Sequence, residues 1–558
     1  MTTHPTATQL RRAVFGWLPV SSKGGSILSL VFVAAGSALL AADQAGGAAP
    51  SSSRPNVLFI AVDDLRPELG CYGVTQVKSP NIDRLASRGV VFTRAYCQEP
   101  LCNATRASLL TGLRPNSTGV FHNETHFRAK NPDVITLPQY FKNNGYVTMT
   151  IGKIFHVGKE DPVSWTETLT PRTLEAVKRP GGSDRKGPGK ANATGKKGGG
   201  GRSPGPALVC EDVPDQAYAD GVTADTAITA LREHKDRPFF LAVGFLKPHL
   251  SFVAPKKYWD MYDPSEFKLA SNPYPPKDCP PIALTPSIEL RARSDIPKDG
   301  PIPSDLARRL IHGYSACVSY VDAQVGRVLD ELERCGSAEN TIIVLWGDHG
   351  WQLGEHDMWG KASNFETSAR VPLIIAAPRH KGNGRQASGL VEFVDIYPTL
   401  CELARLPLPG HLQGLSAVPL LNDPNRTAKQ AAFTQYPCPA FREWAGLPLD
   451  KNMRETFRPL MGKIEKQIQA MDPDDYSPEK YNEHVTGYSI RTERYRFNYW
   501  CDDRKPDKSI ALELYDHEKD PDENVNIAGD KANADLVKQF TQQWRDGWRK
   551  ALPAGKLN

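Results

Sequence analysis

Carboxylate side chains directly follow two apolar segments of this 558-residue chain. Asp63 and Asp64 end one such segment, and Asp348 ends another, followed at once by His349. Carboxylates are hard oxygen ligands, which favour calcium or magnesium over zinc or copper. The three aspartates therefore predict a divalent-cation site, and His349 is either an unusual further ligand or a hydrogen-bonded neighbour of that site.

Basic side chains occupy comparable positions. Lys153, His156 and His249 follow two further apolar segments, and Arg106 lies in a helical stretch. Donors of these kinds are suited to surrounding a tetrahedral oxyanion. Each of these positions taken alone could be a solvated loop or turn. Charged residues at the ends of all four apolar segments, two acidic and two basic, would rarely occur by chance. A metal site beside several cations predicts chemistry on a phosphoryl or sulfuryl group.

Cys102 opens the stretch CNATRASLLTG, which has the pattern of a helix start. A helix N-terminus attracts anions and lowers the pKa of a thiol, so a reactive cysteine fits there. A buried structural thiol or half of a disulfide is the alternative. The ten cysteines of the chain show no CxxC pair and no zinc-like spacing. If Cys102 is kept for chemistry, at least one other cysteine is unpaired or bonds between chains.

Short apolar segments alternate with helical patterns up to about residue 428. This alternation predicts βα units, a large and mostly parallel sheet flanked by helices, and thus an α/β fold. In the longest helical pattern, Ser304 is the expected N-cap and Gly336 the expected C-cap. Strands are expected at 56–62, 146–151, 238–245, 340–346 and 371–377, and helices at 81–88, 136–144, 223–234 and 304–335.

The rest of the chain has a different pattern. GYSIRTERYRFNYW alternates with period two, and an amphipathic segment at 533–550 closes the chain, which together predict a small antiparallel sheet with a helix packed on it. The expected organisation is an export signal and disordered N-terminus at 1–49, a catalytic domain at 50–428 with a flexible Gly/Lys-rich insertion at 170–206, and a C-terminal subdomain at 429–558.

The export signal is expected because Arg11, Arg12 and Lys23 precede a run of about 15 mostly apolar residues that ends in small ones. That run is too short for an ordinary membrane-spanning helix, so no stable membrane insertion is expected once it is removed. The formal net charge of +5 is concentrated in this segment and in residues 178–202. The remainder is acidic, which argues against a nucleic acid as partner.

Longer motifs carry a family resemblance. CNATRASLLTG resembles the C-x-P/A-x-R signature of the type I sulfatases, in which the cysteine is converted to formylglycine. The segments DDLRPELGCYG, TLPQYFKNNGYVTMTIGKIFH, FFLAVGFLKPH, SYVDAQVGRVL and GYSIRTERYRFNYW resemble the iduronate-2-sulfatase group of that family in order and spacing, over roughly residues 54–528. Ala104 stands where many members have proline, and Thr105 where serine is common.

The resemblance implies an alkaline-phosphatase-like sulfatase fold, one calcium ion, and maturation by a formylglycine-generating enzyme. It implies that Arg106 and Lys153 stabilise the aldehyde hydrate and that His156 is the base that releases sulfate. It further implies that His249 protonates the departing sugar oxygen and that Lys361 contacts the sulfate. The implied calcium ligands are Asp63, Asp64, the modified Cys102, Asp348 and His349.

The expected activity is hydrolysis of a sulfated saccharide, with the 2-O-sulfate of a terminal uronate as the closest interpretation. Another sulfated sugar is the first alternative, followed by a phosphodiesterase of the same superfamily and a non-catalytic polysaccharide-binding relative. A uronate needs a cation for its carboxylate, and the segment 119–131, with His122, His126 and Arg128, is expected at the pocket rim. A periplasmic or secreted protein of bacterial origin is favoured over a lysosomal one, because Asn103-Ala104-Thr105 is a glycosylation sequon inside the motif.

Overall fold

The computed structural model describes residues 54–170, 205–427, 429–442 and 445–553. The expected export segment at 1–49 and nearly all of the expected insertion at 170–206 lie outside these residues. The described part of the chain contains no helix that is long and apolar enough to cross a membrane. All ten cysteines are described, and none of them is in a disulfide.

An eight-stranded sheet forms the centre of the fold, in the order β14-β2-β13-β9-β1-β7-β4-β5. It is mostly parallel, as expected, but β13 runs antiparallel to both of its neighbours. A parallel return would need a crossover connection, and only short elements separate β9 from β13. The strands are β1 (Asn56–Val62), β2 (Val90–Phe92), β4 (Val147–Gly152), β5 (Glu167–Thr168), β7 (Phe239–Phe245), β9 (Thr341–Gly347), β13 (Leu373–Ala376) and β14 (Gln386–Ala387).

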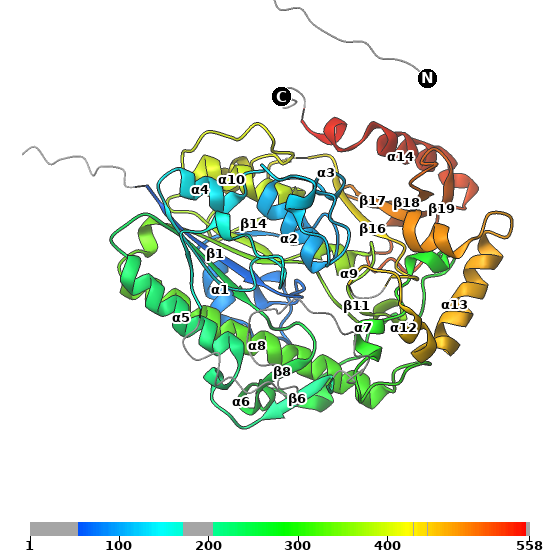
Figure 1. The fold of residues 1–558 in the computed structure, drawn as a ribbon, viewed down its shortest axis with the longest axis horizontal. Coiled ribbons are helices and arrows are strands. Elements are labelled where there is room, and N and C mark those ends of the chain that lie inside the picture. Colours follow the sequence, from blue (N-terminus) through cyan, green and yellow to red (C-terminus); the bar gives the residue numbers. More distant parts are fainter. Residues whose placement is uncertain (1–53, 171–204, 428, 443–444, 554–558) are drawn as a thin grey trace, which may run out of the picture. The chain divides into compact units, whose positions relative to one another are not determined.

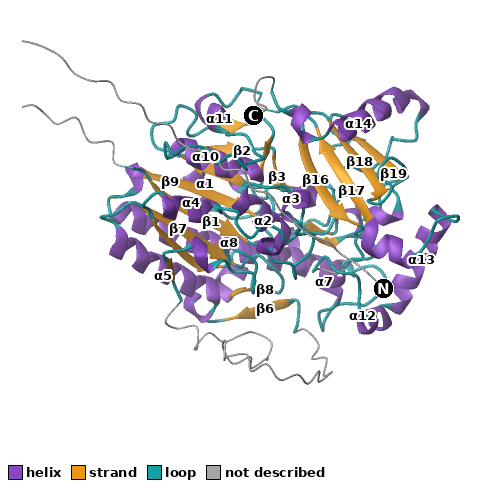
Figure 2. Cartoon of the chain, turned by 45° about the horizontal axis from the view of Figure 1, so that its top comes forward, coloured by secondary structure: helices purple, strands orange, loops and turns teal. Residues whose placement is uncertain are grey.

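Helices cover both faces of this sheet, as Figures 1 and 2 show. Alternate side chains of a strand point to opposite faces, so Leu58 and Ile60 of β1 pack in one apolar cluster and Val57 and Phe59 in the other. A strand buried on both faces must be apolar throughout, which explains the sequence NVLFIAV. The first cluster includes residues of α1 (Pro80–Ala86), α5 (Ala219–His234) and α8 (Ser304–Arg334), and the second includes α2 (Cys102–Thr111), α4 (Leu137–Asn143) and α10 (Ile396–Leu403).

The long helix α8 begins and ends close to the expected residues. Pro303 occupies the N-cap position and Ser304 is already helical, so the Ser304 side chain does not cap the helix as expected. Gly336 follows the last turn with a φ of 69°, a left-handed conformation that glycine adopts without a steric penalty. The helix therefore stops where the sequence indicated, and its start is set by proline rather than by a serine cap.

A second, four-stranded antiparallel sheet lies in the C-terminal part of the chain, consistent with the sequence. Its strands are β16 (Ala432–Pro437), β17 (Val485–Arg491), β18 (Tyr495–Asp502) and β19 (Ser509–Asp516). Helix α14 (Ala534–Asp546) packs on it: Phe540 stacks on Phe497, and Trp544 stacks on Tyr499 with ring centroids 4.0 Å apart.

Buried ion pairs connect this antiparallel sheet to the rest of the fold. Arg496 of β18 contacts Glu366 and Glu523, each at 2.5 Å, and Arg491 of β17 contacts Glu366 at 3.2 Å. Glu366 belongs to α9 (Glu366–Ala369), which precedes β13. Because Arg496 is fully buried, losing its carboxylate partners would leave an uncompensated charge inside the protein.

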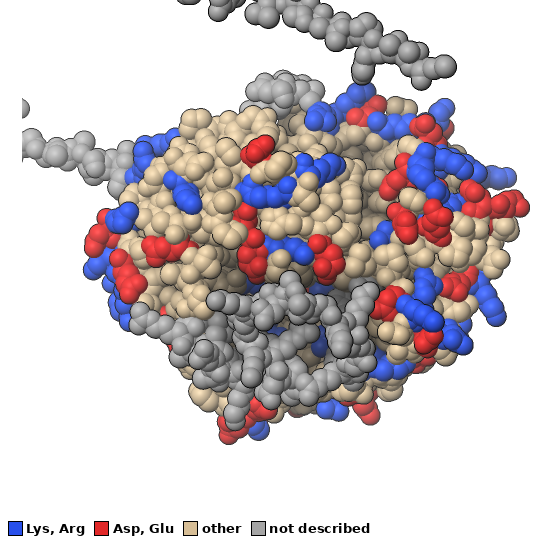
Figure 3. All heavy atoms as spheres, in the orientation of Figure 1, with Lys and Arg blue, Asp and Glu red and all other residues tan. Residues whose placement is uncertain are grey.

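On the face seen in Figure 3, acidic and basic side chains are interspersed over the described residues, without one large patch of a single sign.

Shorter elements complete the described chain. The remaining strands are β3 (Ala95–Tyr96), β6 (Leu208–Glu211), β8 (Phe252–Pro255), β10 (Gln352–Leu353), β11 (Trp359–Gly360), β12 (Arg370–Val371) and β15 (Val391–Glu392). The remaining α-helices are α3 (Pro115–Thr118), α6 (Lys256–Trp259), α7 (Ile288–Arg291), α11 (Val418–Asn422), α12 (Lys451–Thr456) and α13 (Arg458–Met471).

Candidate active site

The acidic residues expected to bind a metal come together at one edge of the large sheet. Asp63 and Asp64 follow β1, and Asp348 and His349 follow β9, which is the parallel neighbour of β1. The carboxyl ends of adjacent parallel strands meet at the same edge, where ligands bind in open α/β sheets. The backbone N–H of Asp64 donates to Asp348 Oδ1 at 2.9 Å, and all four side chains are fully buried.

Arg106 holds two of these carboxylates in place. Its Nη2 donates to Asp63 Oδ1 and its Nε to Asp348 Oδ2, both at 3.0 Å, and the side chain has no solvent exposure. Lys153 Nζ donates to Asp63 Oδ2 at 2.5 Å. Burial raises the pKa of Asp63, but Lys153, His249 and Arg106 outweigh burial and hold the pKa well below its usual range. Asp63 is therefore an ionised carboxylate although its side chain is fully buried.

Asp64 differs from Asp63 although it is the next residue. Lys361 Nζ lies 3.1 Å from Asp64 Oδ1, yet burial, with the charge of Asp63 adding to it, raises the pKa of Asp64 well above its usual range. Two adjacent buried carboxylates with a third from Asp348 repel one another unless a cation lies among them. This donor set therefore fits a divalent cation that prefers oxygen ligands, such as calcium.

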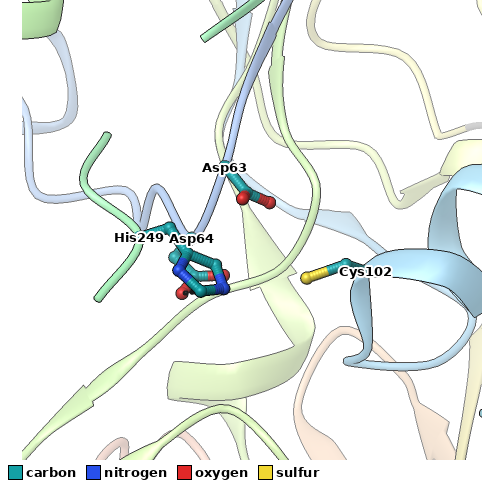
Figure 4. Close-up of side chains that lie close together, drawn as sticks. All are labelled: Asp63, Asp64, Cys102 and His249. Carbon is teal, nitrogen blue, oxygen red and sulfur yellow. Dashed lines mark ion pairs between the residues drawn. The ribbon is translucent and has the colours of Figure 1, made fainter. Parts of the chain in front are cut away.

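Cys102 faces this acidic group from the first turn of α2. Figure 4 shows its Sγ directed toward the side chains of Asp63 and Asp64. The sulfur lies 3.2 Å from His349 Nε2 and 3.6 Å from Lys361 Nζ, and the residue is 1% exposed. Three groupings of the described residues place one ligand atom per residue within 4.8 Å of one another, and two of them share Cys102: Asp63, Asp64, Cys102 and His249, and Cys102, Asp348 and His349.

The two histidines expected to move protons are neutral near pH 7. Burial, with Lys153 and Arg106, lowers the pKa of His156 to about 4, and its buried Nδ1 has no hydrogen-bond partner among the described residues. Burial, with Lys361, lowers the pKa of His249 well below its usual range. His349 is the opposite case: burial lowers its pKa, but Asp348, Cys102 and Asp64 outweigh burial and raise it to about 9.

A cavity of about 540 Å³ opens beside this cluster. Its size is within the range of small-molecule sites, roughly 300–1000 Å³. Its lining includes six of the expected residues, namely Asp63, Cys102, Lys153, His156, His249 and Lys361. The other four expected residues do not line the cavity. Arg106, Asp64 and His349 contact lining residues, namely Asp63, Lys361 and Cys102 in turn, and Asp348 is bonded to Arg106.

The sulfatase family profile matches residues 55–406. The chain belongs to the sulfatase family. It is 35% identical to human iduronate 2-sulfatase over 92% of this chain and 96% of that protein, and 34% identical to mouse iduronate 2-sulfatase over 90% and 96%. It superimposes on the phosphonate monoester hydrolase of Agrobacterium radiobacter with a TM-score of 0.67 and 25% identity, over 89% and 96% of the two chains. This sulfatase is thus a sulfuric ester hydrolase with an alkaline-phosphatase-like fold.

Glu289 is a residue of the sulfatase site that the sequence interpretation missed. It lies in the short helix α7, lines the cavity and is 6% exposed. Its Oε1 lies 3.4 Å from His249 Nε2, and its Oε2 lies 3.3 Å from Lys361 Nζ. No apolar strand precedes Glu289 in the sequence, so the pattern that located the other site residues could not locate it.

The expected rim segment contributes to the cavity through different residues. Asn123 and Glu124 line the cavity, whereas His122, His126 and Arg128 do not. Arg128 instead forms a bidentate pair with Asp161 at 2.6 and 2.7 Å, which fixes its guanidinium within the fold. The basic residues of this segment are therefore not the cation that a sugar carboxylate would need.

Proposed function

We propose that this sulfatase removes the 2-O-sulfate of a terminal uronate from sulfated saccharides, with a formylglycine derived from Cys102 and one bound calcium ion. The observation that carries the proposal is the convergence of Cys102, the ionised Asp63 and the lysines 153 and 361 at one cavity. The similarity to the human iduronate 2-sulfatase supports the substrate, because it spans 92% of this chain and extends past the family match that ends at residue 406.

The residues that would hold the calcium ion differ from those that would bind the substrate and transfer protons. Asp63, Asp64, Cys102, Asp348 and His349 would hold the calcium ion, with His349 binding as a neutral imidazole after losing its proton, and the ion would supply positive charge against the sulfate oxygens. Formylglycine at position 102 would supply a hydrated aldehyde as the nucleophile. Every other contribution comes from side chains that bind, orient or carry protons.

The basic residues have separate tasks in this proposal. Lys153 and Lys361 bind the sulfate group, since both lysines line the cavity. Arg106 orients Asp63 and Asp348 from behind rather than touching substrate, because its donors are already taken up by these carboxylates and by backbone carbonyls. It thereby acts on the nucleophile through the aspartates.

Proton transfer is assigned to the two cavity histidines. A neutral His156 can accept a proton at pH 7, as a base that releases sulfate must. His249 must carry a proton to protonate the departing sugar oxygen, and the negative charge of a bound sulfate ester raises the pKa of His249 toward that state. Glu289, in contact with His249 Nε2, stabilises the protonated imidazole.

The cell-biological part of the proposal rests on the sequence. We propose that residues 1–49 direct export to the periplasm or the outside of a bacterial cell, and that a formylglycine-generating enzyme acts on the chain. We also propose that 50–428 is the catalytic domain and 429–558 a subdomain that supports it.

Activity on a panel of defined sulfated saccharides tests the substrate. Protein co-produced with a formylglycine-generating enzyme is expected to desulfate a disaccharide that ends in a 2-O-sulfated uronate. Rapid turnover of a 6-O-sulfated hexosamine with none of the uronate would overturn the substrate and leave the sulfatase activity standing. The structural similarity to a phosphonate monoester hydrolase favours phosphonate or phosphate esters as the second candidate substrates, so one such ester belongs in the same panel.

A further inference from the structure

Recognition of a uronate needs two separate anion sites. The sulfate on C2 and the carboxylate on C5 lie across the sugar ring from each other, so a cation that binds the carboxylate must be remote from the sulfate-binding lysines. A planar guanidinium is well suited to this because it can donate two parallel hydrogen bonds to a carboxylate. The second anion site should therefore contain a cation that is not already neutralised by the protein.

Arg293 is the arginine that lines the cavity, among the described residues. It follows α7, so the stretch 289–293 runs along the cavity wall and contributes Glu289, Ala292 and Arg293 to it. Glu289 is 6% exposed and contacts the reactive end of the cavity, whereas Arg293 is half-buried. Arg293 thus lies on the same wall as the sulfate-binding end and nearer to solvent.

The guanidinium of Arg293 has no acceptor in the described part of the protein. No hydrogen bond or ion pair joins it to a described side chain or carbonyl, and its buried Nε is unpartnered. Burial lowers the pKa of Arg293, and the charges of Glu289 and Asp295 do not offset burial. Buried arginines elsewhere in the described residues have acceptors for their guanidinium groups: Arg291 donates to three backbone carbonyls, and Arg106 contacts two carboxylates at 3.0 Å. A half-buried, unpaired guanidinium is a costly arrangement that a bound anion would relieve.

The other charged residues of the cavity are poor partners for a sugar carboxylate. Lys247 Nζ donates to the carbonyls of His249 and Ser251 at 2.6 and 2.7 Å, so it is taken up by the backbone. Glu124 lines the cavity with a side chain that is 66% exposed, and its charge repels an anion placed beside it. Lys153 and Lys361 are paired with Asp63 and Asp64 at the sulfate end.

We propose that Arg293 binds the carboxylate of the sulfated sugar and makes the enzyme selective for acidic sugars. This specificity role rests on the proposed function, because it requires a substrate that carries a carboxylate as well as a sulfate ester. Lys298 supports the role indirectly, since its Nζ donates to the carbonyl oxygens of Arg291 and Arg293 and so fixes the turn that presents the guanidinium.

The test compares two disaccharides that differ in one group. One ends in a 2-O-sulfated uronate, and the other is the same compound with its carboxyl group reduced to a primary alcohol. The enzymes are the unaltered protein, Arg293→Gln, Arg293→Lys and the control Arg309→Gln, which removes an arginine from an exposed position of α8 that does not line the cavity. The melting temperature of each variant checks folding, and kcat and KM are measured for both compounds.

Loss of a charge-assisted hydrogen bond predicts that Arg293→Gln lowers kcat/KM on the uronate by about 10- to 100-fold, mainly through KM. The same variant should change kcat/KM on the reduced compound by less than about 3-fold, with Arg293→Lys intermediate and Arg309→Gln unchanged. Equal losses on both compounds, or no loss on either, would overturn the role of Arg293 while leaving the uronate activity in place. Cleavage of an aryl sulfate but of neither disaccharide by the unaltered enzyme would overturn the proposed function, and the role of Arg293 with it.

Discussion

Replacing Glu289 by glutamine removes the negative charge that contacts both His249 and Lys361 while keeping the shape of the side chain. The contacts, at 3.4 and 3.3 Å, are longer than ideal charge-assisted hydrogen bonds, so each is worth about 1 kcal/mol. Their combined loss of about 2 kcal/mol corresponds to a fall in kcat/KM of about 30-fold. We expect most of it in kcat, because a glutamine no longer stabilises the protonated His249.

The assay is steady-state kinetics on the uronate disaccharide together with the melting temperature of each variant. Lys361 keeps Asp64 as a partner at 3.1 Å, so Glu289→Gln should remain folded. The matched control is Glu124→Gln, which removes the same charge from an exposed side chain of the same cavity and should change kcat/KM by less than about 2-fold. Activity of Glu289→Gln within about 2-fold of the unaltered enzyme would refute the role of Glu289 in stabilising protonated His249, as would equal losses in the two variants.

Three further predictions concern the nucleophile, the metal and acid stability. Mass spectrometry of the peptide 98–106 should show an aldehyde in place of the Cys102 thiol, and only unmodified cysteine in fully active enzyme would contradict the mechanism. Exhaustive chelation should abolish activity, and calcium or magnesium should restore it better than zinc; full activity after chelation would rule out a metal role. Burial raises the pKa of Glu392, but Arg114 and Lys429 outweigh burial and lower it to about 2. Ionised Glu392 therefore contributes to the free energy of unfolding above about pH 4.5, and this contribution is lost as the pH falls toward 2. Urea unfolding from pH 6 to pH 3 should therefore show that the unaltered protein is more stable than Glu392→Gln and that this difference in the free energy of unfolding decreases as the pH falls. A difference that stays constant would contradict this assignment.

The sequence predicted the residues that follow strands of the large sheet, and the reason is geometric. Asp63 and Asp348 follow apolar segments that were predicted to be parallel strands, so their position at one edge of the sheet could be inferred from the sequence, whereas the adjacency of the two strands is seen only in the structure. Lys153 and His249 follow β4 and β7, which continue the same sheet and bring them to the same edge. The periodicity of the chain thus carried enough information to assemble the reactive end of the site.

Residues in irregular segments could not be located in this way. Glu289 lies in α7, a helix of four residues, and Arg293 follows that helix. This segment has no periodic pattern, so only the folded chain places the two residues against the cavity. Arg106 was predicted to belong to the site, but its orientation toward Asp63 and Asp348 rather than the cavity depends on the packing of α2 against the sheet edge. The direction of β13 depends on the connection from β9, whose length alone does not reveal whether it crosses the sheet.

The ion pairs between the two sheets limit how this enzyme can be recombined with its relatives. A chimera that joined residues up to 428 to a foreign C-terminal part would bury Glu366 without Arg491 and Arg496 unless the donor supplied equivalent arginines. In the reverse chimera, Arg496 would keep Glu523, which lies in the same C-terminal part, but would lose Glu366. Exchange of substrate specificity between homologues should therefore be attempted at cavity positions such as Ala292 and Arg293, with Glu289 retained, because these can be replaced without separating the buried charges.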